Sequence, residues 1–237
     1  MNQWGRLPCE PPLAGSDAFF PSHSFTNQIQ SLLDTIYPSK FTDETPMSMH
    51  DLRVSPGRTY RYYKEPLFAF GTGLTLTEWR VTGTAPACLA SLSTAAPEQS
   101  CNVSLTVSNV GTRAGDCVVL AYFRAQRSDE EWAARRAGTN GEALAQQQGD
   151  AALMTPIKQL FDYERARSVA AGAERTVTFA VSAADLAEVD EQTGDLVSEA
   201  AGYTLTFDDG GGQTVSMDAA VKGGRVVLER FPQDSRP

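Results

Sequence analysis

The sequence has little histidine, little cysteine and a shortage of positive charge, and each shortage excludes a class of function. The histidines are His23 and His50, and the four cysteines follow no zinc-binding spacing, so we expect neither a metal site nor a cofactor. Acidic residues outnumber basic ones by 29 to 20, which leaves a net charge of −9. A nucleic-acid partner is not expected, because it would require a stripe of lysine and arginine.

Long apolar segments and common catalytic motifs are also lacking. No apolar run approaches the roughly 18 to 20 residues that a membrane helix needs, so no membrane partner is expected. The first residues, MNQWGR, lack the basic region and apolar core of a signal peptide. No G-x-S-x-G motif frames a nucleophile, and the glycines at 210–212 lack the lysine and the following helix of a phosphate-binding loop. We interpret 210–212 as a hairpin turn.

What the sequence does contain is a series of short β patterns from about residue 98 onward. Val103, Leu105 and Val107 alternate with polar residues, as in a half-buried antiparallel strand. Further strands, separated by turns rich in Gly, Asp and Asn, are predicted at 118–123, 176–181, 203–207, 214–217 and 226–228. This series predicts an all-β fold built as an antiparallel β-sandwich.

The four cysteines, Cys9, Cys88, Cys101 and Cys117, allow three pairings if all are oxidised. Spacing alone does not choose among these pairings. Buried free thiols are one interpretation, since unpaired cysteine is common in protein cores. A disulfide between Cys101 and Cys117 is another, because these two residues flank an expected hairpin.

The chain before about residue 65 has no regular pattern apart from a short helix predicted at 24–33. Prolines recur through 35–65 and block helix continuation, so we predict an extended strap there. Arginines and tyrosines interleave in the strap at Arg53, Arg58, Tyr60, Arg61, Tyr62 and Tyr63. Either they line a sugar-binding rim or they attach the strap to a neighbouring domain by packing and hydrogen bonds. We favour attachment, because the strap has no core of its own to support a site.

The stretch 66–81, PLFAFGTGLTLTEWRV, concentrates aromatic residues and glycine. Its marked residues are Phe68, Phe70, Gly71, Gly73 and Trp79. Two glycines separated by one residue favour a sharp turn with positive φ or a close approach of another segment. We predict a structural hinge between two domains, with Phe70 and Trp79 as its apolar anchors. Ordinary packing is the alternative.

Several motifs, in order, resemble the β-xylosidase branch of glycoside hydrolase family three. YPSKF at 37–41, PMSMHDLR at 46–53 and PGRTYRYY at 56–63 resemble Y-P-x-x-F, P-M-x-x-M-x-M-R and P-G-R-T-Y-R-F-Y. Residues 66–79 resemble P-x-F-x-F-G-x-G-L-S-Y-T-x-F, and 109–122 resemble N-x-G-x-x-A-G-x-x-V-V-x-L-Y. The chain departs from these motifs at His50, Leu52, Thr72 and Leu76.

The resemblance implies a domain organisation. Residues 1–82 would be an irregular N-terminal segment, of which 35–82 resemble the end of the family's α/β domain. Residues 83–230 would be a fibronectin type III-like, and hence immunoglobulin-like, sandwich with an insertion at about 125–155. Within the insertion, a capping box at 128–131 predicts a short helix over 130–137. Its Trp132 either contacts a partner domain or a sugar, or belongs to a mobile surface loop.

The resemblance also implies an activity, the hydrolysis of β-linked xylosides or arabinosides with net retention. Retention needs two carboxyl groups about 5 Å apart. In the family both lie in domains that precede the residues matched here, so no catalytic residue is carried over to this chain. The implied partners are the catalytic barrel and the α/β domain of the same enzyme, and a β-linked oligosaccharide. A stand-alone, non-catalytic module that binds a carbohydrate or a protein is the alternative.

Two further features follow from the matched motifs. The family is extracellular or endomembrane, and Asn102-Val103-Ser104 is an N-glycosylation sequon that would be used in a secreted parent, with a chance match as the alternative. Asp185 and Asp190 match the family's D-L…D-x-x-G loop and turn, so we predict solvated or capping carboxylates there.

Overall fold

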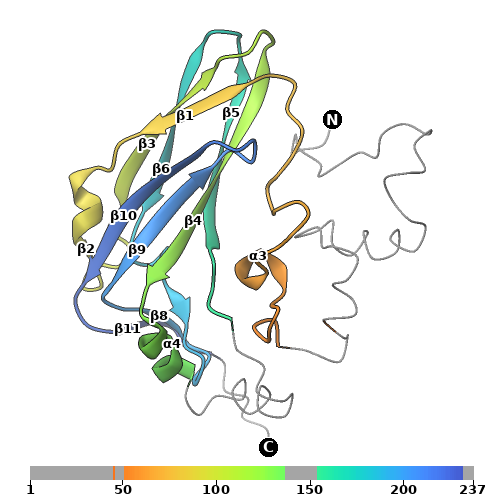
Figure 1. Ribbon diagram of the computed structural model, residues 1–237. Coiled ribbons are helices and arrows are strands. Elements are labelled where there is room, and N and C mark those ends of the chain that lie inside the picture. Colours follow the sequence, from red (N-terminus) through yellow and green to blue (C-terminus); the bar gives the residue numbers. More distant parts are fainter. Residues whose placement is uncertain (1–44, 46–50, 137–153, 232–237) are drawn as a thin grey trace, which may run out of the picture.

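The computed structural model describes residues 45, 51–136 and 154–231, which form a β-sandwich with a strap against one side (Figure 1). The helices are α3 (Thr59–Tyr62), the 3-10 helix η2 (Ala87–Ser91) and α4 (Asp129–Arg136). The strands are β1 (Trp79–Gly83), β2 (Leu92–Ser93), β3 (Cys101–Asn109), β4 (Gly115–Gln126), β5 (Gln159–Val169), β6 (Glu174–Val181), β7 (Glu188–Val189), β8 (Leu196–Ser198), β9 (Ala201–Asp208), β10 (Thr214–Lys222) and β11 (Val226–Glu229). The predicted all-β fold is confirmed.

Two sheets form the layers of the sandwich. One has the strand order β1-β3-β6 and the other the order β2-β10-β9-β4-β5. The long ladders β3–β6, β4–β5, β4–β9 and β9–β10 are antiparallel, whereas β2 joins β10 in parallel. A third small sheet, β11-β8-β7, lies at one end of the sandwich (Figure 1).

The core lies between the two sheets and is built by the alternation that the sequence shows. Val103, Leu105 and Val107 of β3 are fully buried, and the residues between them point outward. Phe179 of β6 meets Phe207 of β9 with ring centroids 5.0 Å apart, which joins one sheet to the other. Alternate burial of apolar side chains thus supplies most of the hydrophobic stabilisation.

Strand β5 has no sequence pattern that predicts it. It is an edge strand, and Ala166 and Val169 are its fully buried residues among positions that are otherwise half-buried or exposed. An edge strand that buries so little does not need the apolar alternation that identifies β3. Its long ladder with β4 supplies the pairing instead.

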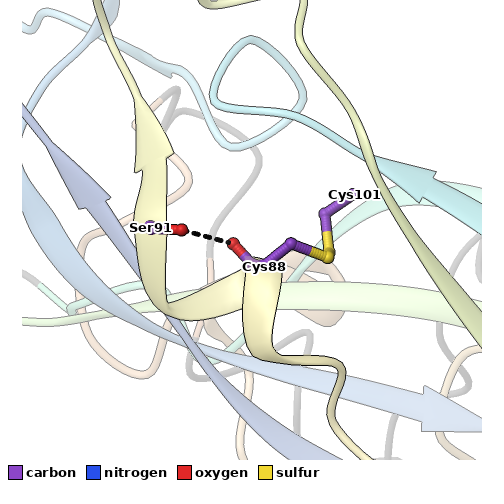
Figure 2. Close-up of a disulfide and its surroundings, with 3 residues drawn as sticks. All are labelled: Cys88, Ser91 and Cys101. Atoms are coloured by element: carbon purple, nitrogen blue, oxygen red, sulfur yellow. Dashed lines mark hydrogen bonds between the residues drawn. A yellow bond between two sulfur atoms is a disulfide. The ribbon is translucent and has the colours of Figure 1, made fainter.

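The disulfide joins Cys88 of η2 to Cys101 at the start of β3, with Cα atoms 5.7 Å apart (Figure 2). The predicted Cys101–Cys117 bond is therefore wrong. The chain crosses between sheets after β3, so β3 and β4 are not paired in a hairpin. Cys117 is buried and forms no disulfide, so the interpretation as buried thiols holds for Cys117 but not for Cys88 and Cys101; Cys9 lies outside the described residues.

Helix α4 lies at the start of the predicted insertion and is packed against the sandwich. The capping box is confirmed, because Glu131 N donates to Ser128 Oγ at 3.2 Å and Ser128 N donates to Glu131 Oε2 at 2.7 Å. Trp132 is 6% exposed, and the Arg127 guanidinium lies over its ring, with Cζ 5.1 Å from the ring centroid. The interpretation that Trp132 contacts a sugar or a partner domain is therefore wrong, since its side chain belongs to the buried core cluster. Residues 137–153 and the helix predicted at 24–33 lie outside the described residues.

The glycine-rich and acidic loops behave as turns. Residues 210–212 connect β9 to β10, and Asp209 Oδ1 accepts hydrogen bonds from the N–H groups of Gly211 and Gln213, which confirms the hairpin. Asp185 accepts from Ser182, and Asp190 accepts from the backbone of Gln192 and Thr193. The carboxylates at 185 and 190 are therefore capping groups, as predicted.

Candidate interdomain interface

The described part of the strap contacts the outer face of the five-stranded sheet through Tyr60. Its ring stacks on Phe70 with centroids 4.8 Å apart and lies 6.1 Å from the ring of Tyr122 on β4. Its hydroxyl accepts a hydrogen bond from Leu160 N of β5 at 3.2 Å. Tyr122 is fully buried although it points away from the sandwich core. The strap therefore creates a second, smaller buried layer on this face.

A lysine completes this layer. Lys158 Nζ lies 4.0 Å from the centroid of the Tyr122 ring, in cation–π geometry, and 4.0 Å from the Asp208 carboxylate. Burial lowers the pKa of Lys158, and the charge of Asp208 opposes that shift. The ring and the carboxylate together compensate for the partial desolvation of the ammonium group.

Gly71 lets the 66–81 stretch approach β4 closely. Its φ is +87°, and a Cβ there would lie 2.4 Å from Leu120 Cδ1. A side chain would be strained by the backbone and would also meet Leu120. Gly73 is not among the described residues with positive φ. One of the two glycines thus has the conformation expected for both.

Trp79 anchors the end of the 66–81 stretch in the sandwich core. Its side chain is 6% exposed, and its Nε1 donates to Thr75 Oγ1 at 3.1 Å. Thr77 Oγ1 donates to the buried Asn109 Oδ1 at 2.6 Å. Asn109 Nδ2 in turn donates to the carbonyl of Val169 at 2.9 Å. Asn109, the first residue of the N-x-G motif, therefore links the 66–81 stretch, the turn after β3 and the end of β5 through hydrogen bonds of its side-chain amide.

An ion-pair cluster attaches the strap to the third sheet. Arg53 makes a two-point contact with Asp51, with Nε at 3.0 Å and Nη2 at 2.7 Å, and its Nη1 pairs with Glu191 between β7 and β8. The hydrogen bond to Asp51 and the pair with Glu191 raise the pKa of Arg53. The Arg53 carbonyl also accepts a hydrogen bond from Met154 N at 2.7 Å. These contacts favour attachment over a sugar-binding rim, because Arg53 and Tyr60 are already engaged.

Exposed apolar side chains lie beside this attached surface. Leu67, Leu74 and Leu76 are 58%, 74% and 81% exposed, and Tyr163 of β5, paired with Leu120 in register, is 52% exposed. Phe68 is half-buried. Exposed apolar patches mark interaction sites on soluble proteins. We call Leu67, Leu74, Leu76 and Tyr163 the apolar rim.

The described residues offer this surface little means for chemistry. No group of histidine, cysteine and acidic residues suited to a metal ion occurs among them. Asp51 and Glu191 are both paired with Arg53. Burial alone would raise the pKa of Asp51, but the hydrogen bonds from Arg53 and its positive charge outweigh burial and lower that pKa. Within the described part of the chain, no helix is long and apolar enough to cross a membrane.

The predicted site residues separate into two places. Gly71 lies against Leu120 of β4 and Trp79 is buried at the start of β1, whereas Phe70 stacks on Tyr60 of the strap. Asn102 is exposed on β3, which pairs with β1 in the three-stranded sheet. Tyr122 and Lys158 complete the buried layer under the strap, but hydrophobic periodicity indicates neither residue. The one sequence signal for Tyr122 is that it ends the motif at 109–122.

Comparisons with known proteins identify a domain family and relatives that this chain matches. A family model described as a fibronectin type III-like domain matches residues 145–209. The protein named "Probable exo-1,4-beta-xylosidase bxlB" of Aspergillus flavus is 31% identical over 212 residues, and the exo-1,4-beta-xylosidase bxlB of Emericella nidulans is 32% identical over 208 residues. Each alignment covers 84% of this chain and 24% of the relative.

A solved structure gives the same match at the level of the fold. The GH3 exo-beta-xylosidase XlnD, in complex with a xylobiose aziridine activity-based probe, superposes with a TM-score of 0.66 at 23% identity. The superposition covers 86% of this chain and 26% of that chain. The chain therefore spans about a quarter of the length of the proteins that it matches. These comparisons confirm the predicted fibronectin type III-like domain and the resemblance to the family three β-xylosidases.

Proposed function

Because the chain carries a fibronectin type III-like domain and matches the C-terminal region of family three exo-β-xylosidases, we propose that it is the accessory C-terminal part of such an enzyme. The whole enzyme hydrolyses β-linked xylosides or arabinosides of xylan-type polysaccharides. Its two catalytic carboxyl groups lie in the preceding domains. This chain supplies the sandwich and the strap that hold those domains together.

The observation that carries this proposal is the two-sided character of the strap and the 66–81 stretch. One side is attached to the sandwich through Tyr60, Gly71 and Trp79. The other side presents the exposed leucines of the apolar rim to solvent. A segment that is rigidly attached on one side and apolar on the other fits a covering partner. That partner is the α/β domain and barrel of the same enzyme.

The disulfide supports an extracellular or endomembrane location for the enzyme. Structural disulfides form and persist in oxidising compartments and are rare in the cytosol. The bond joins Cys88 to Cys101, 13 positions further along the chain, at the start of β3. Secretion also places the enzyme with its proposed partner, a β-linked oligosaccharide derived from xylan.

A chimera tests the proposal. Residues 1–237 replace the matched C-terminal region of the Emericella nidulans xylosidase, and the hydrolysis of an aryl β-xyloside is compared with that of the relative truncated before this region. We expect the chimera to be active and both the truncated relative and the purified chain to be inactive. The reason is that the chain completes the interface but contributes no catalytic carboxyl group.

Substitutions in the apolar rim locate the interface. Leu74→Asp with Leu76→Asp should abolish most of the chimera's activity and leave the melting temperature of the isolated chain unchanged, because both side chains are exposed there. Val227→Asp is the matched control, since Val227 is a partly exposed apolar residue in the third sheet. Full activity of the Leu74/Leu76 variant would contradict the interface. Retention of isolated residues 1–237 on xylan, with an inactive chimera, would favour the stand-alone binding module.

A further inference from the structure

We propose that Asn102 carries an N-linked glycan, on the face of the sandwich opposite the strap. Asn102-Val103-Ser104 is the single N-x-[ST] sequence among the 237 residues. A sequon in a short sequence is a weak signal by itself. Its place in the fold and its neighbour in the sequence supply two independent observations. Neither depends on the proposed function.

The first observation is the orientation of Asn102 on β3. Cys101 and Val103 are 3% and 0% exposed, so the residue between them points away from the core. Asn102 is exposed, and its partner in the β3–β6 ladder is the small, exposed Ala180. On the other side, the ladder with β1 ends at the Gly83–Leu105 pair, before it reaches Asn102. A sugar on the Asn102 amide can therefore extend into solvent without displacing a neighbouring side chain.

The surrounding surface is polar, as a glycan-bearing surface should be. The outward residues next to Asn102 in the β3–β6 ladder are small and polar or carry a single methyl group, and Ser104 Oγ lies 3.3 Å from Thr178 Oγ1. The strap contacts β4 and β5 of the other sheet through Tyr60, and Tyr163 of the apolar rim lies on β5. A glycan at Asn102 thus shields the three-stranded sheet and leaves the candidate interface open.

The second observation is the disulfide at the adjacent residue. Cys101 is bonded to Cys88, which requires an oxidising compartment during folding. N-glycosylation takes place on chains that enter the secretory pathway, which is such a compartment. The fold therefore needs the compartment in which the sequon is recognised.

The modification is a group transfer without redox change. The Asn102 side-chain nitrogen forms a bond to the anomeric carbon of an oligosaccharide carried by a polyisoprenyl diphosphate. The carbon–oxygen bond to the diphosphate breaks, and the diphosphate leaves with the bonding electron pair. The amide nitrogen loses one proton to solvent. The hydroxyl of Ser104, two residues later, is the sequon element that the transferase recognises.

The test uses the full chain, residues 1–237, secreted from yeast behind a heterologous leader. Peptide N-glycosidase F should lower the mass of the secreted chain by one glycan and convert Asn102 to aspartate in the peptide map. Asn102→Gln and Ser104→Ala should both lose the enzyme-sensitive mass, and Ser104→Thr should keep it. The same chain made in the bacterial cytosol provides the unmodified mass.

The outcomes are decisive even if one variant folds poorly. Ser104→Ala and Ser104→Thr differ at an exposed position and keep Asn102, so their comparison isolates the sequon from folding. A secreted chain that contains the Cys88–Cys101 bond but shows no mass change with the glycosidase would overturn the proposal. Because the readout is mass, the result is separate from the activity of the chimera.

Discussion

Truncation of Trp79 to alanine tests whether the 66–81 stretch is anchored in the sandwich or is a loose linker. Trp79 is 6% exposed at the first position of β1, and it belongs to the same hydrophobic cluster as Val107 and Cys117. Its indole nitrogen donates to Thr75 Oγ1 at 3.1 Å. The substitution removes both the packing and this hydrogen bond.

The magnitude follows from the burial. Removal of a buried tryptophan side chain lowers the free energy of unfolding by about 3 to 5 kcal/mol. Single domains have free energies of unfolding of about 5 to 15 kcal/mol, so this loss is a large fraction of the total. In a domain of this size each kcal/mol shifts the melting temperature by about 2 to 4 °C, which predicts a drop of about 6 to 20 °C.

Urea and thermal unfolding, followed by circular dichroism, measure this loss on residues 1–237. Glu98→Ala is the control, because Glu98 is exposed in the loop before β3 and should change stability by less than about 0.5 kcal/mol. If Trp79→Ala were as stable as this control, the 66–81 stretch would be a linker and the buried attachment would carry no energy.

Three further changes test other parts of the structure. Gly111→Ala places a Cβ 2.6 Å from the Glu78 backbone nitrogen, so it should lower the free energy of unfolding in urea by about 1 to 3 kcal/mol. Gly224→Ala is the control, because its Cβ meets nothing within 4 Å, and it should lower that free energy by less than about 0.5 kcal/mol. Cys88→Ser removes the disulfide between residues 13 positions apart and should cost roughly 3 kcal/mol, and reductant should not destabilise the variant further. The backbone N–H of Ser168 and the guanidinium of Arg165, both on β5, lower the pKa of Asp116. The Asp116 carboxylate therefore stabilises the fold at a pH above its unfolded pKa of about 3.9. This contribution is lost as the pH falls through the lowered pKa of the folded state. Asp116→Asn should therefore reduce stability at pH 7 and do so less at about pH 3; an equal loss at both values would show that the charge of Asp116 is immaterial.

Local patterns were sufficient where a residue's role depends on its own segment. Alternation at Val103, Leu105 and Val107 predicts β3, and the Ser128–Glu131 capping box predicts α4. The glycine pair was half informative: Gly71 has the predicted positive φ, whereas Gly73 does not. Of the two predicted anchors, Trp79 is buried in the core, whereas Phe70 is half-buried and stacks on Tyr60 of the strap.

The candidate interface was only half visible in the sequence. The contacting residues of the strap are contained in the motifs, but the surface that receives them is not. Tyr122 points away from the core, so its position in β4 predicts exposure, and it is buried because the Tyr60 ring and the Lys158 side chain lie against it. Lys158 likewise becomes part of the site because β5 carries it beside Tyr122.

By itself, then, the sequence determined the sandwich class, the main strands and the motif that attaches the strap, because periodicity, capping and glycine conformation are local properties. Tertiary structure alone decided the partner of Cys101, the burial of Trp132 and the formation of β5. Each depends on which sheet the next strand joins. That choice is set by long-range burial, whose free energy is shared among segments far apart in the chain and leaves little trace in any one of them.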